Sequence, residues 1–168
     1  MQDPSIAAAL DVYAGTPGTL RSLLGALPEP VIVAPADEGW SPRDVVVHLA
    51  SLDPFSMVGR VRAILDQDEP ELPDLDEHDV LERSGLRGRP LADVLDEMAQ
   101  TRAAALAWLR ELTPAQLART GRHSAVGRLS AAEIIHHKAW HDLLHLQQIC
   151  RMISIPLDAG SGSMRRYH

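Results

Sequence analysis

The sequence predicts an all-α fold, and more narrowly a four-helix bundle in one domain. Three observations support this prediction. The chain has 168 residues, the length of an ordinary single domain, and 45% of them are hydrophobic, which is enough for a core. Alternating patterns typical of strands are missing, and the only β-like fragment, residues 31–33, is bracketed by prolines. Apolar residues at helical spacing and helix-capping signals occur along most of the chain instead.

The first helical region covers about residues 4–26. Its apolar residues recur at helical spacing: Ile6, Leu10, Tyr13, Leu20, Leu23 and Leu24. The segment Gly-Thr-Pro-Gly at 15–18 interrupts this region, and proline lacks the backbone N–H that a helix interior needs. We therefore expect a break or a kink there, with the Thr-Pro pair able to restart a helix.

The second helix has the clearest start in the chain. Ser41 is a preferred N-cap residue, Pro42 suits the first helical position, and Asp44 places a carboxylate in the first turn. Helical spacing of apolar residues then continues to Leu65. The Asp-Pro pair at 53–54 predicts either a kink or the end of one helix and the start of another.

A long surface connection is predicted over residues 66–89, which are acidic and proline-bearing and then basic. A connection of this length is typical of a crossover. A third helix is predicted from about residue 90 to residue 112, and a short helix follows at 113–117. Residues 120–129, which hold two glycines, are predicted to be a loop.

The fourth helix begins at Ser130, where the sequence Ser-Ala-Ala-Glu has the S-x-x-E pattern of a capping box. It is predicted to continue to about Ile153 and to stop before Pro156. These boundaries predict one bundle domain over residues 1–157. The tail over residues 158–168 contains glycine and serine and is expected to be flexible.

Composition and charge exclude several classes of protein. The formal net charge is −7, which argues against a nucleic-acid partner because binding a phosphate backbone needs a basic face. The longest apolar runs are far shorter than the roughly 20 residues that span a bilayer. The N-terminus has no signal-peptide pattern, so we expect a cytoplasmic protein with no membrane association. A single cysteine, Cys150, excludes an internal disulfide and a zinc site made of cysteines.

Histidine is unusually frequent, with eight residues against six of the Phe, Trp and Tyr types together. Four of the histidines, at 136, 137, 141 and 145, lie within ten residues of one another. Residues four apart share a helix face, and two imidazoles at that spacing can bind one metal ion. His137/His141 and His141/His145 both have this spacing, so His141 belongs to either pair. Spacing alone leaves that choice open.

A metal site in a helical bundle needs a further ligand from another helix. His48 lies in the apolar run 45–50 of the second helix and is expected to face inward. Three neutral imidazoles leave a coordination position open for water or substrate, as in catalytic rather than structural sites. The alternative interpretation is that these histidines are ordinary surface or hydrogen-bonded core residues.

Two parts of the chain resemble signatures of the DinB/YfiT-like family of metal-binding four-helix bundles. The second helix carries the first signature: WSPRD at 40–44, HLA at 48–50 and Asp53. The last helix and its approach carry the second: GRLS at 127–130, WHDLLH at 140–145 and QI at 148–149. In this order and at this separation, the resemblance covers about residues 5–155.

The resemblance implies an up-down-down-up bundle with a long crossover and a divalent metal ion, zinc or nickel, held by His48, His141 and His145. It favours His145 over His137 as the ligand. His137 then either lies next to the site or substitutes for His145. Characterised family members include thiol-dependent transferases and an isomerase that use mycothiol or bacillithiol, and members are often homodimers. Many relatives have a further histidine where this chain has Leu144, a difference that we attribute to packing or to the residues around the ligands and not to loss of a ligand.

Other residues near the predicted site have two interpretations each. Asp142 and Gln148 could orient the imidazoles, although an exposed helix position explains Asp142 better. Cys150 is interpreted as a small buried residue, so any reacting thiol would come from outside the protein. The tryptophans at 40 and 140 are expected to pack in the core. Five arginines either contact an acidic thiol cofactor or are solvated: Arg60, Arg62, Arg83, Arg87 and Arg89.

These features predict a metal-dependent enzyme, a transferase or hydrolase, in which a bound low-molecular-weight thiol or water attacks a small electrophilic substrate. Two alternatives stand beside it. One is a non-catalytic, stress-associated metal-binding bundle. The other is a helical dimerisation or interaction domain whose histidines are incidental. The expected partners are a small-molecule substrate and a second copy of the chain.

Overall fold

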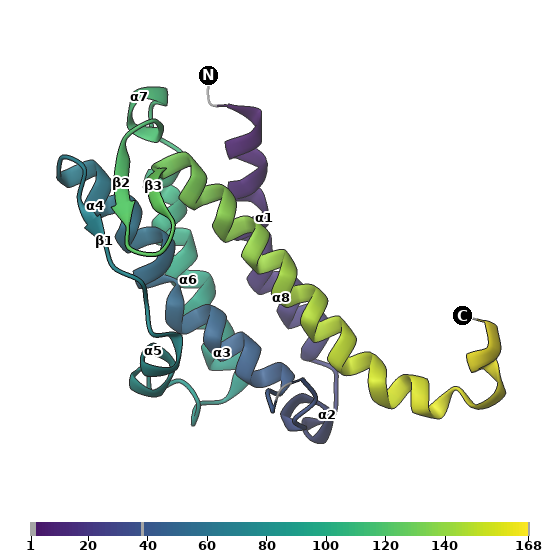
Figure 1. The fold of residues 1–168 in the computed structure, drawn as a ribbon. Helices are drawn as coiled ribbons and strands as arrows, with labels where there is room; N and C mark the ends of the chain where they lie inside the picture. Colours follow the sequence, from purple (N-terminus) through teal and green to yellow (C-terminus); the bar gives the residue numbers. More distant parts are fainter. Residues whose placement is uncertain (1–2, 38, 168) are drawn as a thin grey trace.

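The computed structural model describes residues 3–37 and 39–167 and confirms the predicted four-helix bundle (Figure 1). The four long helices are α1 (Pro4–Leu24), α3 (Pro42–Leu52), α6 (Leu91–Leu109) and α8 (Ala131–Gly160). Helices α1 and α3 each pack against both α6 and α8, so α1 and α3 occupy opposite corners. In Figure 1, α1 and α8 run downward whereas α3 and α6 run upward. Because α3 and α6 are parallel, the chain between them must return along the bundle, as the predicted crossover does.

Shorter elements connect and cover the bundle. In chain order, they are α2 (Glu29–Val33), the π-helical turn η1 (Pro54–Gly59), α4 (Arg60–Asp66), β1 (Glu71–Leu72), α5 (Glu77–Arg83), α7 (Pro114–Leu117), β2 (Thr120–His123), β3 (Gly127–Ser130) and the 3-10 helix η2 (Gly162–Tyr167).

None of the helices in the described ranges, 3–37 and 39–167, is long and apolar enough to cross a membrane.

The two helices that carry the predicted site begin at the predicted cap residues, Ser41 and Ser130, and each start is a capping box. The Ser41 hydroxyl accepts from the Asp44 backbone N–H at 3.2 Å, and the Asp44 carboxylate accepts from the Ser41 N–H at 3.0 Å. Ser130 and Glu133 form the same reciprocal pair at the start of α8. Each box satisfies backbone donors that have no partner inside the helix, and so fixes where the helix begins.

Helix α1 is continuous, so the predicted break at residues 15–18 is wrong. Pro17 lies inside the helix and cannot donate to the Tyr13 carbonyl oxygen four residues earlier. The Arg102 guanidinium on α6 donates to that oxygen instead, with an Nη1–O distance of 2.9 Å. A side chain from another helix thus satisfies the carbonyl that proline leaves free, which the local sequence does not reveal.

Helix α8 also passes through a proline and ends at Gly160, so the predicted stop before Pro156 is wrong. Residues 154–160, which include Pro156, are exposed. The C-terminal end of α8 projects past the bundle in Figure 1. The division into a bundle domain over residues 1–157 and a flexible tail over residues 158–168 stays a prediction.

The Asp-Pro pair at 53–54 separates two helices, which was one of its two predicted outcomes. Helix α3 ends at Leu52, η1 follows, and α4 continues from Arg60. Pro54 has no N–H for the α-helical bond to Ala50, and the chain widens into a π-helical turn. The Asp53 side chain is 1% exposed and lies inside the bundle.

Two segments were assigned the wrong secondary structure from the sequence. The β-like fragment at 31–33 is part of helix α2, and the predicted loop at 120–129 holds the antiparallel hairpin β2–β3. Strand β1 of the crossover adds to β2 in parallel. Gly121 permits this close approach, because a Cβ there would lie 2.9 Å from Leu72 Cδ1. Strands of two to four residues are too short for an alternating pattern to reveal them.

The core consists of two separate apolar clusters. The first, which includes Ile6, Leu10, Val61 and Ile135, lies toward the hairpin end. The second, which includes Leu20, Leu24, Val46, Leu95 and Ile149, lies toward α2 and α5. Along α6 and α8, buried polar residues (Arg102 and Asp142) lie between the members of one cluster and those of the other. The predicted histidine site and a group of buried charges both occupy this intervening layer.

Candidate metal centre

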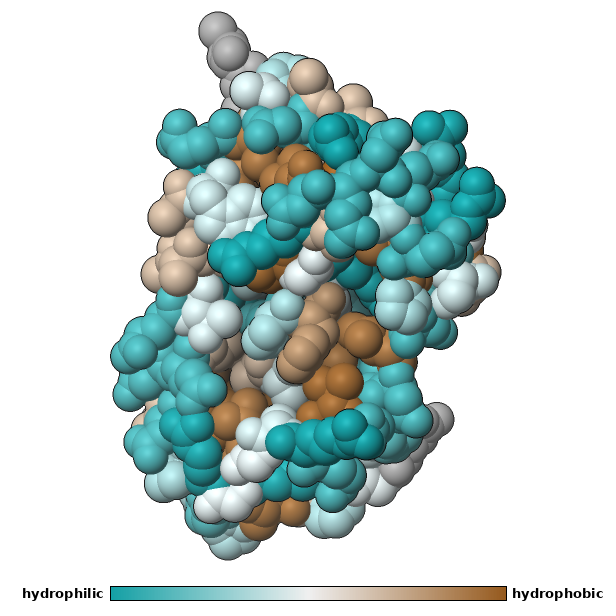
Figure 2. Space-filling view, turned by 90° about the vertical axis from the view of Figure 1, so that its left-hand side faces the viewer, coloured by the Kyte–Doolittle hydropathy of each residue, from teal (hydrophilic) through white to brown (hydrophobic). Residues whose placement is uncertain are grey.

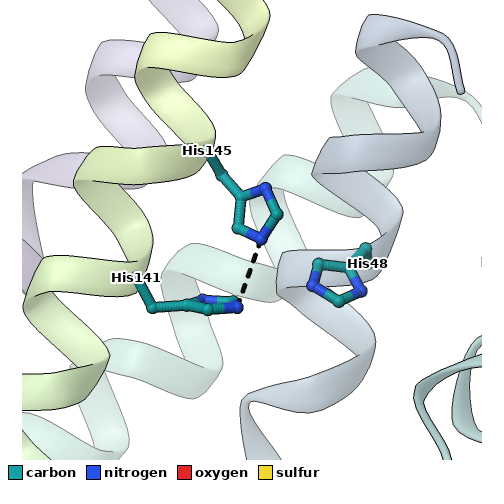
Figure 3. Close-up of side chains that lie close together, drawn as sticks. All are labelled: His48, His141 and His145. Atoms are coloured by element: carbon teal, nitrogen blue, oxygen red, sulfur yellow. Dashed lines mark hydrogen bonds between the residues drawn. The ribbon is translucent and has the colours of Figure 1, made fainter. Parts of the chain in front are cut away.

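Three histidines come together between α3 and α8: His48 from α3, and His141 and His145 from successive turns of α8 (Figure 3). Ring nitrogens of the three side chains all lie within 4.8 Å of one another. Nε2 of His141 and Nε2 of His145 are 3.2 Å apart. The ring centroid of His48 lies 4.8 Å from that of His145 and 5.6 Å from that of His141. The i, i+4 spacing on α8 and the inward face of α3 therefore produce one convergent group.

Several ring nitrogens of this group have no hydrogen-bond partner. His48 is 2% exposed, and within the described ranges neither of its nitrogens is hydrogen-bonded. The same holds for Nδ1 of His141. A buried nitrogen without a partner is costly, because burial removes its hydrogen bonds to water. Free imidazole lone pairs that converge from two helices are the donor set that a divalent transition metal ion requires.

The three imidazoles are neutral at neutral pH. Burial, followed by the positive charges that His145 and Lys138 can carry, lowers the pKa of His48 from 6.5 to about 3. Burial and Lys138 likewise lower the pKa of His141 to about 3. Burial also lowers the pKa of His145, and the hydrogen bond to Gln148 opposes this shift. Neutral imidazole is the form that binds a metal ion, so no proton must first be removed.

A chain of hydrogen bonds determines which nitrogen of His145 is free. Gln148 Nε2 donates to Asp37 Oδ2 at 2.9 Å, which turns the amide oxygen of Gln148 toward His145. That oxygen lies 2.8 Å from His145 Nδ1 and can only accept, so Nδ1 carries the proton. The lone pair of His145 is therefore on Nε2, which points into the cluster. Orientation of an imidazole by its other nitrogen is the usual way in which proteins prepare a histidine ligand.

A cavity of about 510 Å³ adjoins the cluster on the side of His141, which is one of its lining residues. Its walls come from η1, α4, the crossover, the hairpin and the first half of α8. On the face with α4, α5 and the sheet, Figure 2 shows a hollow at mid-height with hydrophobic surface inside and hydrophilic surface above and below. A cavity of this size suits a small molecule, for which sites of about 300–1,000 Å³ are common.

Comparisons with known proteins agree with this architecture. The family model described as the DinB superfamily matches residues 13–149. The chain belongs to the DinB superfamily. Among solved structures, the fold is similar to YfiT from Bacillus subtilis, described as a probable metal-dependent hydrolase with an unusual four-helix bundle topology. The TM-score is 0.80 at 21% sequence identity, over 90% of this chain and 87% of that one. No curated protein matches the sequence significantly.

His137, the alternative partner of His141 in sequence, lies apart from the cluster in this DinB-superfamily protein. Its ring centroid is 6.0 Å from that of His141, and it lines the cavity. It is not among the three histidines whose ring nitrogens converge. The structure therefore places His137 as a neighbour on the cavity side, one helical turn before His141.

A buried group of charges beside the cluster was missed by the sequence reasoning. Arg102 from α6 forms ion pairs with Asp53 and Asp142, and Lys138 Nζ lies 2.8 Å from Asp53 Oδ1 and 3.1 Å from Asp142 Oδ1. Each residue is at most 3% exposed. Burial disfavours ionised Asp142, but Lys138 and Arg102 hold the pKa of its carboxyl below the ordinary value. We call these four residues the ionic layer.

The ionic layer corrects the interpretation of Asp142, which is not an exposed helix residue. It is fully buried, and its carboxylate contacts Arg102 and Lys138 rather than a histidine. The i, i+4 spacing of Lys138 and Asp142 was the one available signal. The contribution of Arg102 had no local signal, because its partners are 40 and 49 residues away in the sequence.

Three other expectations about single residues also change. Cys150 is exposed rather than buried, although it is not among the residues that line the cavity. Trp140 is 55% exposed, whereas Trp40 packs edge-on against His48 with a centroid distance of 5.2 Å. Arg60 alone among the five arginines considered lines the cavity. The other four contact surface groups: Arg62 lies over Trp108, Arg83 pairs with Asp79, Arg87 with Glu82, and Arg89 with Glu97.

Proposed function

We propose that this protein is a metal-dependent enzyme in which His48, His141 and His145 hold one divalent ion, zinc or nickel. In this proposal a low-molecular-weight thiol or water, bound at the ion, attacks a small electrophilic substrate in the adjoining cavity. The observation that carries the proposal is the convergence of three neutral imidazoles, with unpartnered nitrogens, beside a cavity of about 510 Å³.

The residues around the site divide the tasks of such an enzyme. A divalent ion would lower the pKa of a bound thiol or water, so that the nucleophile is available at neutral pH. Gln148 and Asp37 hold the His145 ring in one orientation, and Trp40 packs against His48. The hydrophobic walls of the cavity, among them Leu52, Met57 and Ile134, exclude water from a bound substrate.

The nucleophilic thiol in this proposal is an external molecule such as mycothiol or bacillithiol. Cys150, the single cysteine, does not line the cavity. Its exposure therefore leaves the proposal unchanged, even though it was expected to be buried. A thiol-conjugation assay with several low-molecular-weight thiols, run with zinc-loaded and nickel-loaded protein, tests the transferase form. Hydrolysis of activated esters and amides without added thiol tests the hydrolase form.

Metal content is the primary test. Untagged protein, which has no added histidines to recruit nickel, is expected to contain about one divalent ion per chain by elemental analysis. The double variant His141→Ala/His145→Ala is expected to contain none while it retains its helical circular dichroism. His136→Ala, which removes an exposed histidine from the same helix, is the matched control and should bind the ion normally. Unchanged metal content in the double variant would contradict the assignment.

His137 receives a separate test, because its sequence spacing also suits a ligand. His137→Ala should keep stoichiometric metal binding, since its ring does not converge with the other three. Loss of the ion in this variant, together with retention in His145→Ala, would mean that His137 substitutes for His145.

A non-catalytic metal-binding bundle is the second candidate, and one observation favours it. The histidine cluster joins α3 to α8 in the layer between the two apolar clusters, so a bound ion would cross-link the bundle. This function predicts a large drop in melting temperature on chelation and no turnover with any thiol or ester. Turnover that follows metal content across the histidine variants would exclude it.

We also propose that the protein is a homodimer. Trp140, Leu143 and Leu144 are 40–55% exposed on one stretch of α8, and a second copy would cover them. Light scattering is expected to give twice the mass of the chain. Trp140→Ser/Leu144→Ser should shift the protein toward the monomer, and a monomeric wild-type protein at micromolar concentration would contradict the proposal.

A further inference from the structure

We infer that the cavity selects small molecules that carry a carboxylate on an apolar body, and that Lys138 and Arg60 bind the carboxylate. This inference rests on the proposed function, because it takes the cavity as the substrate site. Both residues line the cavity, and both carry positive charge in a largely hydrophobic enclosure.

Lys138 contributes a buried ammonium group with hydrogen-bonding capacity to spare. Its Nζ lies 2.8 Å from Asp53 Oδ1 and 3.1 Å from Asp142 Oδ1, and these two contacts engage at most two of its N–H donors. An ammonium group has three N–H donors, and a buried donor without an acceptor is costly. Lys138 is 3% exposed and lies one helical turn before His141. A carboxylate oxygen that enters the cavity would give the remaining donor an acceptor.

Arg60 contributes the second positive charge. Its guanidinium is half-buried and donates from Nη2 to the Pro73 carbonyl oxygen at 3.1 Å. Within residues 3–37 and 39–167, this arginine forms no ion pair. Burial lowers its pKa, and the nearby carboxylates of Asp74 and Glu77 only partly oppose this shift. The guanidinium can bind both oxygens of a carboxylate, whereas an ammonium acts as a point charge.

The three acidic residues of the cavity do not cancel these charges, because they are committed or exposed. Glu133 accepts from the Ser130 N–H and hydroxyl in the capping box. The side chains of Asp74 and Glu77 are 68% and 56% exposed, so water stabilises their charges at the rim. Arg128, also at the rim, is 66% exposed and pairs with Glu69. In the interior, Arg60 therefore has no paired counter-charge, and Lys138, whose charge the ionic layer balances, keeps a donor free.

The remaining walls determine the body of the molecule. Apolar residues dominate them: Leu52, Met57, Leu75, Ala125, Val126, Leu129 and Ile134. They come from η1 and its neighbours, the crossover, the hairpin and α8, and enclose a molecule from several sides. A ligand with one anionic end and an aromatic or aliphatic body matches both parts of the cavity.

Calorimetric titration of zinc-loaded protein with 3-phenylpropanoate, and with the neutral 3-phenylpropanamide, tests the inference. The acid is expected to bind at least tenfold more tightly than the amide. Arg60→Gln should weaken binding of the acid at least tenfold without affecting the amide. Arg128→Gln is the matched control, because it removes the same charge from the same cavity at an exposed, paired position, and it should change the affinity less than twofold.

Lys138→Met tests the second residue, but it leaves the buried carboxylates with one cation fewer and can impair folding. The charge-balanced variant Lys138→Met/Asp142→Asn keeps the ionic layer neutral and is measured alongside it. In whichever variant retains the wild-type circular dichroism, the acid should lose at least tenfold in affinity. Wild-type affinity for the acid in a folded variant would overturn the role of Lys138.

Further outcomes separate this inference from the metal assignment. Equal affinity for acid and amide would overturn the inference and leave the metal proposal intact. Binding of the acid that persists in Arg60→Gln and the Lys138 variants but disappears on chelation would place the carboxylate on the ion, and would also overturn it. Selective binding of the acid together with unchanged metal content in His141→Ala/His145→Ala would uphold the carboxylate site while contradicting the proposed metal site.

Discussion

The layer between the two apolar clusters holds two groups of buried polar residues with opposite character. In the ionic layer, two cations face two carboxylates, and Arg102 alone donates to Asp53, Asp142 and the Tyr13 carbonyl. In the histidine cluster, three imidazoles face one another and leave nitrogens without partners. His48 is as buried as the ionic layer and the other two histidines are half-buried, but the ionic layer supplies its own counter-charges and the histidine cluster does not. The comparison teaches that unpaired donor atoms, rather than burial of polar groups, indicate where a ligand belongs.

The two groups also differ in what they contribute to the apoprotein. Arg102 joins α6 to Asp53 beyond the end of α3, to Asp142 on α8, and to the carbonyl freed by Pro17 in α1. It therefore contacts all four corners of the bundle. The histidines join only α3 and α8. Without an ion they stay neutral, because burial lowers the pKa of His48. The ionic layer specifies the packing of the helices, and the cluster is prepared for an added group.

Removal of Arg102 should disrupt the ionic layer and have the largest effect on the free energy of unfolding. Arg102→Met leaves Asp53 and Asp142 buried with only Lys138 between them, and removes the donor to the Tyr13 carbonyl. Loss of one partner from a buried ion pair costs about 3–5 kcal/mol, so the free energy of unfolding should fall by about that amount in urea denaturation. Arg110→Met removes an exposed pair with Asp11 and should cost under about 1 kcal/mol. Similar losses in the two variants would refute the distinction.

Loss of the contact between Gln148 and His145 should weaken metal binding by the histidine cluster without unfolding the bundle. Gln148→Ala removes the acceptor that keeps the proton of His145 on Nδ1. Loss of such an orienting contact raises metal dissociation constants about 10- to 100-fold, and a competition titration with a zinc chelator measures the change. Gln147→Ala, at the preceding exposed position, should leave the affinity unchanged. An unaltered affinity in Gln148→Ala would show that the hydrogen bond does not prepare the ligand.

Acid should destabilise the metal-free protein through the cluster. The unfolded chain binds a proton at His48 with a pKa near 6.5, whereas the folded chain does so near 3. Between these values protons favour the unfolded state, so the free energy of unfolding falls as pH drops below about 6.5 and stops falling near 3. The contribution of His48 at pH 5 is about 2 kcal/mol. Chelated protein should show this slope, to which His141 adds, and His48→Gln should reduce it. An equal slope in that variant would assign the effect to other groups.

The smallest expected effect concerns the link between Pro17 and Arg102. In Pro17→Ala, the new N–H can donate to the Tyr13 carbonyl, so this oxygen no longer depends on the guanidinium. The cost of Arg102→Met should therefore be smaller by about 1 kcal/mol in the Pro17→Ala background, the net value of one hydrogen bond. A double-mutant cycle in urea measures the coupling. Strict additivity of the two substitutions would mean that the contact does not stabilise the continuous helix.

The elements with strong local signals were predictable from the sequence. Cap residues identified the starts of α3 and α8, and the i, i+4 spacing placed two histidines on one face of α8. The elements that were mispredicted depend on partners that are distant in sequence. Helix α1 does not break at Pro17, where Arg102 binds the freed carbonyl, and the hairpin at 120–130 forms on a strand from the crossover. Local propensity carries no information on such partners.

The sequence by itself determined the class of fold, the helices that carry the site and the candidate ligand types, because these follow from spacing along one helix and from local capping. Spacing alone allowed His137 or His145 as the second ligand on α8, and a family resemblance favoured His145. The tertiary structure brought His48 to that face, buried Asp142 in an ion network, and placed the spare donor of Lys138 and the unpaired charge of Arg60 in one cavity. Those features depend on which groups from other helices arrive within a few ångströms, and only the packing of the bundle decides that.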